Sequence, residues 1–456
     1  MASFVGRTAE LDALETAGMG DGLRTCILCG NSRSGTSSIL KRFCNGKRCL
    51  RISVPNGTER EMLTSFRDGI SFFLGGRTDS EYSCFEDAFS AASTCVPEAQ
   101  IIAFDNIAYA LSRSDSFAKG LADFINGPAT ASGCMVIVCC SPAGAILYAN
   151  SKKTSPLYNK FQTIVDVKPL GYYELSSFHP KMGFIDRFRT YLTVGGVPMY
   201  NALMNKNDYG TCIEKNFLGQ YPRLCAEAEY IIKLSSVPYA ECSAILGDIS
   251  KCTGRPIDIA NREGLSRQLC DIYLKKLESE KLIRRLTPIG NSPKKPVYVM
   301  NDPMMTFYQT VIKMNPDVVY RNSPGYVDIK NSVDQFLELS MKTVCAEYIR
   351  SNYDCQSVGA WWMRDESTSR ANICAIVKDG RKKYTLISDC KFRSGKIDLE
   401  ALDFLKNRAA SMSDVPDDKR FILFSMSGFD KKLMKAASKE NIRLVGPDDL
   451  IDIPTD

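Results

Sequence analysis

Short apolar runs, each followed by a glycine-rich or polar segment, mark the first part of the chain. The run TCILC at 25–29 ends at Gly30, and a polar loop then leads into the amphipathic stretch 37–43. A second run, AQIIAFDN at 99–106, carries Asp105 near its end. Apolar runs of this length are typical of buried parallel strands. We therefore predict a strand at each run and a helix over 37–43.

The pattern changes in the middle of the chain. Helix-like periodicity over 245–249, 256–260 and 266–277 precedes two β-rich runs, 282–286 and 296–300, which are joined by a turn rich in Gly, Asn, Ser and Pro. Helices followed by such a hairpin have the layout of a winged helix. We predict that module here, with its second helix able to enter a DNA major groove.

A β-rich pattern dominates the last third. Runs at 370–377 and 384–391 flank the Asp379-Gly380 pair, which is a hairpin signal. If these two residues form the turn, Asn372 lies opposite Ile387 and diagonal to Asp389. A helix over 398–409 and a strand over 421–425 would then continue a mixed sheet.

The segment GNSRSGTS at 30–37 carries the first candidate chemistry. It follows the P-loop pattern G-x-x-x-x-G-K-[ST], in which loop amides and a lysine hold phosphates and the final hydroxyl holds Mg²⁺. Thr36 stands where the pattern has lysine. An ordinary Gly/Ser turn is the alternative for this loop taken alone. We predict a nucleotide site formed by Gly30, Arg33, Gly35, Thr36, Ser37 and Ser38.

Asp105 supports the nucleotide interpretation. In P-loop enzymes a carboxylate at a strand tip helps to hold Mg²⁺, so we predict Ser37 and Asp105 as the metal-binding residues. Asn106 follows, at a position where many such ATPases carry a glutamate that activates water. An amide cannot act as a general base near neutral pH. The sequence therefore indicates weakened or lost hydrolysis.

The second candidate site lies in the predicted C-terminal hairpin. Asp389-Cys390-Lys391 matches the (D/E)xK element of the PD-(D/E)xK nuclease core, in which carboxylates hold Mg²⁺ and the lysine helps to position water. Asn372 replaces the first aspartate, and Glu338 on a predicted helix is a candidate third carboxylate. We predict Asp389, Lys391 and Glu338 as catalytic residues, with Mg²⁺ at Asp389. A β-hairpin with ordinary surface charges is the alternative.

Composition fits a large cytoplasmic protein. The chain has 456 residues and 44% hydrophobic content, enough for about three domains by the usual ~150 residues each. No run reaches the ~18 apolar residues of a membrane span, and the N-terminus lacks the build of a signal peptide. The 18 cysteines are predicted to be free thiols. Cys26 and Cys29 are expected on opposite faces of a strand, which argues against a zinc site.

Charge alone does not indicate nucleic acid, because the net charge is only +6. The range 267–295, however, holds eight basic residues against three acidic ones. Basic side chains in a winged helix can grip phosphate. A winged helix that contacts protein through a solvated basic face is the alternative. The predicted DNA contacts are Lys275, Lys276, Arg284, Arg285, Lys294 and Lys295.

Several motifs together resemble a known family. The opening FVGRTAEL at 4–11 is similar to the F-x-G-R-x-x-E-L start of archaeal and bacterial P-loop ATPases of the AAA+/STAND group. SPLY at 155–158 and GGVPMY at 195–200 also resemble that family, the latter its lid element GxP. The segment 298–303 is similar to the end of the family's winged helix, and the C-terminal part to its W-W, D and E-x-K pattern. The chain departs from the family at Thr36, Asn106, Asn372 and Asp389.

The resemblance implies an α/β architecture in five parts. These are a P-loop ATPase-like core with a parallel sheet over 1–170, a helical lid over 171–236, the winged helix over 237–303, a connector over 304–325, and a restriction-endonuclease-like α/β domain over 326–456. It also implies that ATP or ADP is the nucleotide and that Pro198 senses its base.

Three functions remain open from the sequence. The first is a nucleotide-binding switch or scaffold with weak or absent hydrolysis, able to act on DNA through its winged helix. The second is Mg²⁺-dependent cleavage of nucleic acid by the C-terminal domain. The third is a catalytically inert protein that binds a protein partner.

Overall fold

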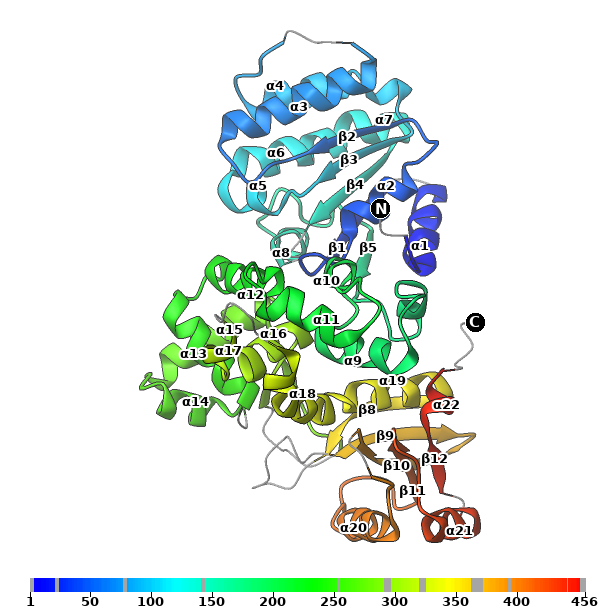
Figure 1. Cartoon of the computed structure of the whole chain (residues 1–456). Helices are drawn as coiled ribbons and strands as arrows, with labels where there is room; N and C mark the ends of the chain where they lie inside the picture. The colour runs from blue at the N-terminus through cyan, green and yellow to red at the C-terminus, as the bar shows by residue number, and fades with distance from the viewer. Residues whose placement is uncertain are drawn as a thin grey trace. The chain divides into compact units, whose positions relative to one another are not determined.

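The chain folds into two compact units, and Figure 1 labels most of their helices and strands. The first unit comprises Met1–Pro169 and Val197–Met199, and the second comprises Leu170–Gly196 and Tyr200–Asp456. The structure is a computed structural model. It describes residues 4–20, 24–76, 80–140, 144–251, 254–290, 297–319, 325–361, 372–392, 395–440 and 442–451.

A five-stranded parallel sheet forms the centre of the first unit. Its strands lie in the order β2-β3-β4-β1-β5, and every neighbouring pair is parallel. β1, β3 and β4 are buried at every residue, as expected for a sheet covered on both faces. The α/β fold class typical of P-loop NTPases is thereby confirmed. The strands are β1 Thr25–Gly30, β2 Cys49–Ser53, β3 Ile101–Asp105, β4 Met135–Cys140 and β5 Thr163–Val167.

Helices supply a separate core on each face of this sheet. Cys26 packs in one cluster with apolar residues of α1 and α2, whereas Cys29 packs in the other with Phe66 and Phe104. The alternation of a strand thus separates the two cysteines as predicted. The helices are α1 Thr8–Met19, α2 Thr36–Phe43, α3 Glu59–Leu74, α4 Phe85–Ser93, α5 Ala108–Arg113, α6 Asp115–Phe124, α7 Thr130–Ser132 and α8 Gly144–Ser151.

The second unit begins with helices and a short antiparallel hairpin. β6 Ile283–Leu286 pairs with β7 Val297–Met300 directly after three helices, the order of elements predicted for this segment. The helices before the hairpin are α9 Phe184–Val194, α10 Pro198–Leu203, α11 Tyr209–Ile213, α12 Arg223–Leu234, α13 Tyr239–Lys251, α14 Pro256–Arg262 and α15 Arg267–Ser279. Those after it are α16 Pro303–Phe307, α17 Pro316–Val319, α18 Tyr326–Ser340 and α19 Lys342–Asn352.

The predicted connector over 304–325 contains buried helical residues. Met304, Met305 and Phe307 of α16 are fully buried, and the Asp302 carboxylate caps that helix by accepting a hydrogen bond from the Met304 amide at 2.8 Å. Packing of this apolar run makes the segment part of a core, which Pro and Gly content alone did not indicate. The predicted domain limits stay predictions.

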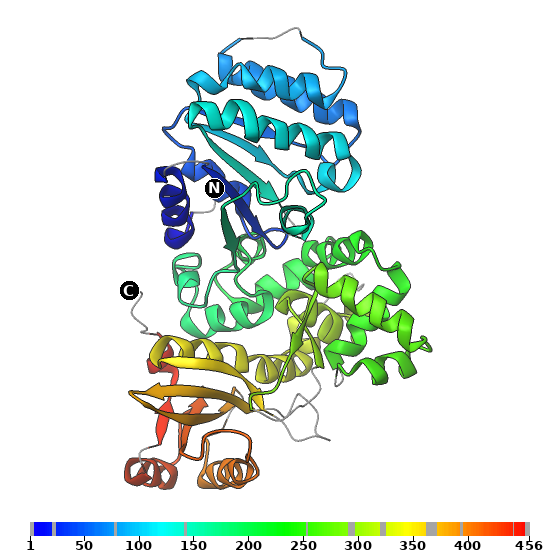
Figure 2. The ribbon, with the colours of Figure 1, turned by 180° about the vertical axis from the view of Figure 1, so that it is seen from behind.

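A five-stranded mixed sheet completes the second unit. Its order is β12-β11-β10-β9-β8, with antiparallel pairing from β8 to β10 and parallel pairing from β10 to β12. Figures 1 and 2 show α20 and α21 on one face and α19 on the other. The elements are β8 Cys355–Trp361, β9 Asn372–Asp379, β10 Lys382–Lys391, α20 Leu399–Ala410, β11 Lys419–Ser425, α21 Lys431–Glu440, β12 Arg443–Val445 and α22 Pro447–Ile451.

The predicted register of the β9–β10 hairpin is wrong by one turn residue. Asp379 pairs with Lys382, so Gly380 and Arg381 form the turn, and Ile387 pairs with Cys374 instead of Asn372. The reason is that Gly380 takes the first turn position with φ 60°, as a Gly-X hairpin turn requires. This register, continued by one residue, puts the backbone of Asn372 opposite Asp389.

Helix length and hydropathy also bear on the membrane prediction. Among the described residues, no helix is both long and apolar enough to cross a membrane.

The aromatic cluster of the first unit provides a test of the fold. Phe66 is fully buried, with its ring centroid 5.0 Å from that of Phe89 and 5.8 Å from that of Phe104. We expect Phe66→Ala to lower the free energy of unfolding by about 3–5 kcal/mol, because it leaves a cavity. Phe72→Ala, on the same helix but 91% exposed, should change it by less than about 0.5 kcal/mol. Denaturant unfolding of both variants checks this, and equal losses would contradict the packing.

Candidate nucleotide site and C-terminal carboxylate site

The loop between β1 and α2 has the geometry of a phosphate-binding turn. Gly35 has φ 94° and Arg33 has φ 67°, both in the left-handed region. Gly30 has no room for a side chain, because a Cβ atom there would lie 2.5 Å from Ser34 Oγ and 2.7 Å from the Val167 carbonyl oxygen. A strand, a tight loop and a helix N-terminus together form an anion-binding arrangement.

The other predicted nucleotide residues gather around this turn. Thr36 is the first residue of α2 and is buried, whereas Ser37 and Ser38 in the same helical turn are exposed. Pro198 approaches the loop, since its Cγ atom lies 3.7 Å from the place of a Cβ on Gly35. The structure therefore brings together the residues from the P-loop and the GGVP segment.

Arg7 contacts the backbone of the P-loop, a role that the sequence motifs did not predict. Its guanidinium donates a 2.9 Å hydrogen bond to the Ser34 carbonyl and a 2.6 Å bond to the Lys168 carbonyl, and it pairs with Glu10 at 2.7 Å. Only 6% of Arg7 is exposed. The opening motif FVGRTAEL contained this residue, but nothing in the sequence showed which backbone groups it would meet.

Asp105 at the tip of β3 is engaged by two side chains. Its Oδ1 accepts a hydrogen bond from Ser37 Oγ at 3.0 Å, and its Oδ2 lies 2.5 Å from Arg51 Nη2. The Asp105 side chain is 4% exposed and that of Arg51 is 34% exposed. Ser37 and Asp105, the predicted magnesium pair, do meet. Sequence analysis missed Arg51, whose only signal was a charge within the otherwise half-buried strand CLRIS.

Mg²⁺ fits this arrangement poorly while Arg51 stays on Asp105. Hydroxyl and carboxylate oxygens are suitable magnesium ligands, but one carboxylate oxygen already faces a guanidinium. The guanidinium balances the negative charge of Asp105, so the paired carboxylate attracts a dication less than an unpaired one would. The metal would have to displace Arg51 or remain bound mainly by phosphate and water.

Asn106 is fixed in a strained position beside this site. Its φ is 62°, and its side-chain amide donates to the Val54 carbonyl at 3.0 Å and to Asn56 Oδ1 at 3.3 Å. Asparagine tolerates such backbone angles better than most residues. The amide thus has a structural role and offers no group for general-base chemistry.

The predicted C-terminal site residues lie near the end of β10. Glu338 of α18 accepts a 3.1 Å hydrogen bond from the Phe392 amide, one residue beyond Lys391. Asp389 and Lys391 lie on the same face of the strand because they are two residues apart. Among the described residues, no group of three His, Cys, Asp or Glu side chains could hold a metal ion.

The charges of three basic residues act on the Asp389 carboxylate. Burial raises the pKa of Asp389, and the positive charges of Lys342, Lys391 and Arg408 act in the opposite direction. Burial likewise lowers the pKa of Lys342. Each predicted metal-binding carboxylate, Asp105 and Asp389, therefore has protein cations nearby.

The predicted DNA contacts are only partly available. Lys275 and Arg284 are exposed, but Lys276 Nζ donates to the Ser236 carbonyl at 3.3 Å. Arg285 pairs with Glu278 at 3.2 Å and donates to the Tyr298 hydroxyl at 3.2 Å. The remaining two, Lys294 and Lys295, lie outside the described residues.

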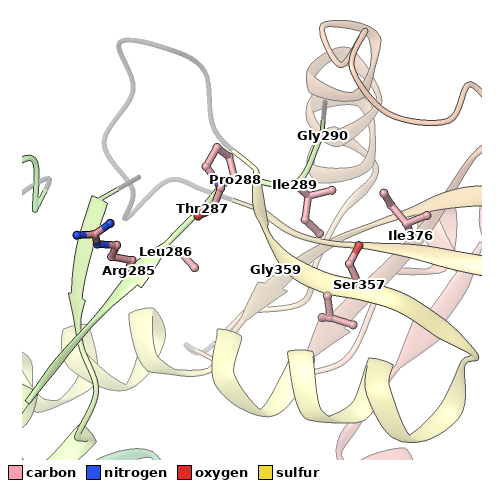
Figure 3. A pocket seen from close by; sticks show the side chains of 10 residues that line it. Arg285, Leu286, Thr287, Pro288, Ile289, Gly290, Ser357, Gly359 and Ile376 are labelled. Carbon is pink, nitrogen blue, oxygen red and sulfur yellow. The ribbon is translucent and has the colours of Figure 1, made fainter. Parts of the chain in front are cut away.

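A cavity of about 480 Å³ lies between the segment after β6 and strands β8 and β9. Figure 3 shows Ile289 and Ile376 along it, with the Arg285 guanidinium turned away from them. Apart from Arg285, the described lining residues carry no charge. The described lining of this cavity therefore contains no carboxylate, histidine or cysteine that could bind a metal.

Comparisons with known proteins agree with a P-loop fold. No family model matches the chain. The uncharacterized protein MJECL04 of Methanocaldococcus jannaschii is 25% identical over 251 residues, which are 53% of this chain and 56% of that protein. The match thus spans little more than half the length of that relative.

Solved structures extend the comparison to the fold. The Walker-type ATPase PABY2304 of Pyrococcus abyssi is similar with a TM-score of 0.53 and 17% identity, covering 67% of this chain and 96% of that one. ORC2 of Aeropyrum pernix, determined with ADPNP and ADP, has a TM-score of 0.41 and 12% identity, covering 73% of this chain and 93% of that one. The likeness to the Pyrococcus protein confirms the P-loop ATPase fold. The STAND motifs, the winged helix and the nuclease-like domain stay predictions.

The Arg7 contacts provide a test of how the P-loop is held. We expect Arg7→Lys to lower the free energy of unfolding by about 1–3 kcal/mol, because two separate guanidinium nitrogens bind the Ser34 and Lys168 carbonyls and a single ammonium nitrogen does not replace both. Arg60→Lys, at an exposed position, is the matched control and should have an effect below about 0.5 kcal/mol. Denaturant unfolding compares the two, and similar losses would show that Arg7 does not secure the loop.

Proposed function

We propose that this chain is a nucleotide-binding switch or scaffold that holds ATP or ADP at its P-loop and hydrolyses it slowly or not at all. The observation that carries the proposal is the intact strand–loop–helix around Gly30 and Gly35, combined with Thr36 and Asn106 at the two altered positions. The fold retains the phosphate cradle, whereas the charge and the base that serve catalysis are replaced.

Without the lysine, the P-loop would bind phosphate through its remaining donors. Backbone amides, the N-terminus of α2 and Arg33 can all face phosphate oxygens, whereas the Ser37 hydroxyl donates its one hydrogen to Asp105. The missing lysine removes a charge-assisted contact typically worth about 1.5–3 kcal/mol. We therefore expect affinity to be weakened by about one to two powers of ten relative to a complete P-loop, without being abolished.

A switch role is supported by the path of the chain at Pro198. Val197–Met199 belongs to the first unit, whereas the residues on both sides of it belong to the second. Pro198 lies close to Gly35 and is also the first residue of α10. A nucleotide that shifts the P-loop would therefore act directly on a covalent link between the units.

The first test measures nucleotide binding by the wild-type protein and by a variant in which the P-loop lysine is restored. ATP and ADP at micromolar to millimolar concentration should raise the melting temperature, and ATP should remain intact over hours. Thr36→Lys should tighten binding by about 10- to 100-fold, whereas Ser116→Lys, which adds the same charge at an exposed position of α6 outside the loop, should change it by less than about threefold. Calorimetry and chromatography of the nucleotide measure both effects. No shift with either nucleotide, in Mg²⁺ or in EDTA, ends the proposal.

Nucleic-acid cleavage by the C-terminal domain is the second candidate function. It is favoured by the position of Glu338 beside the end of β10, which carries Asp389 and Lys391. Cleavage would require a metal held by these carboxylates, with Lys391 positioning water. DNA binding through Lys275 and Arg284 stays a prediction, since Lys276 and Arg285 make contacts within the fold.

Cleavage assays separate this candidate from an inert interaction protein. DNA and RNA incubated with the protein in Mg²⁺ or Mn²⁺ should be cut, and Lys391→Ala should lose at least about 100-fold of that activity. Lys383→Ala, an exposed lysine on the same strand, should retain it. Equal products from wild type and Lys391→Ala would assign the cutting to a contaminant. If the protein shows neither cleavage nor nucleotide binding, the third possibility remains, a protein that acts through a partner.

A further inference from the structure

Arg51 reaches Asp105 because of the register between two neighbouring strands. Arg51 pairs with Ala103 in the β2–β3 ladder, and Asp105 follows two residues later on β3. Paired residues and those two positions away share one face of a sheet, so the two side chains are diagonal neighbours. The pairing follows from the strands themselves and does not depend on a mobile loop.

The ion pair satisfies Asp105 without any external ligand. Ser37 occupies one carboxylate oxygen and Arg51 the other, in a setting where Asp105 is almost fully buried. An ionised carboxylate in such a place needs a cation or several donors. In P-loop enzymes that cation is supplied with the nucleotide as Mg²⁺, whereas here a side chain of the chain itself supplies it.

Arg51 also retains capacity to interact further. Its Nε–H is buried and has no hydrogen-bond partner in the structure. A guanidinium carries five N–H donors and stays charged at any physiological pH. Its side chain is 34% exposed, so it is not sealed inside the sheet.

We propose that Arg51 is a built-in counter-cation of this P-loop, and that adenine nucleotide consequently binds without Mg²⁺. The inference rests on the proposed function, because it concerns how that same site receives its ligand. It reverses the expectation that Ser37 and Asp105 recruit a metal. Arg51 is a positioning residue: it holds Asp105 and, through it, the Ser37 hydroxyl at the start of α2.

Calorimetry with ADP tests the proposal on the full-length protein. Titrations are run in Mg²⁺ and in EDTA at matched ionic strength. For wild type, the two dissociation constants should agree within about threefold, because the site already holds its counter-charge. This comparison needs no variant and is unaffected by folding defects. Binding that is at least about tenfold weaker in EDTA would overturn the counter-cation proposal while leaving nucleotide binding itself intact.

Variants of Arg51 show whether this residue makes ADP binding independent of Mg²⁺. Arg51→Gln should make binding depend on Mg²⁺ by about tenfold or more, since Asp105 is then free to attract the metal. Arg51→Lys keeps the charge and should remain independent of Mg²⁺. Arg48→Gln is the matched control, because Arg48 is an exposed arginine that pairs with Glu98, and it should behave like wild type.

The outcomes distinguish a failure of the counter-cation proposal from a failure of the proposed function. If Arg51→Gln folds but stays as independent of Mg²⁺ as wild type, Arg51 is not the counter-cation. If Arg51→Gln does not fold, Arg51→Lys decides: a gain of Mg²⁺ dependence there contradicts the proposal. Absence of ADP binding under every condition overturns the proposed function, and the counter-cation proposal with it.

Discussion

The contact between Arg51 and Asp105 is the constraint on which the proposed nucleotide site depends. Asp105 ends strand β3, and Ser37 is the second residue of α2, the helix that follows the P-loop. Joining them through one carboxylate fixes the spacing between strand tip and loop, and Arg51 makes that carboxylate tolerable in a buried place. The first unit therefore keeps its phosphate cradle in shape through its own charges.

The second unit uses related chemistry at another sheet. The positive charges of Lys342, Lys391 and Arg408 oppose the rise in the pKa of Asp389 on β10, so protein cations again act on a carboxylate at a predicted metal position. At both positions the sequence predicts an asparagine, Asn106 or Asn372, in place of an acidic group of the family that the chain resembles. Asn106 has a clear structural task, since its amide bonds the Val54 carbonyl.

Sequence patterns predicted the parts of this protein that depend on local chain properties. Apolar runs located β1 and β3, glycines located the P-loop, and alternation placed Cys26 and Cys29 on opposite faces. The hairpin turn was misplaced by one residue, because Asp-Gly can enter a turn in two ways and only the strand pairing decides. Arg7 and Arg51 could not be assigned, since their partners Ser34 and Asp105 lie 27 and 54 positions away.

We predict that this site binds nucleotide without the two features by which P-loop ATPases are usually recognised, the lysine and the metal. The most direct measurement is a crystal structure of the protein grown with ATP and Mg²⁺. We expect intact ATP against the loop from Gly30 to Ser37, with Arg51 still on Asp105. ADP in the site after incubation with ATP, or Mg²⁺ bound by Ser37 with Arg51 displaced from Asp105, would contradict the account.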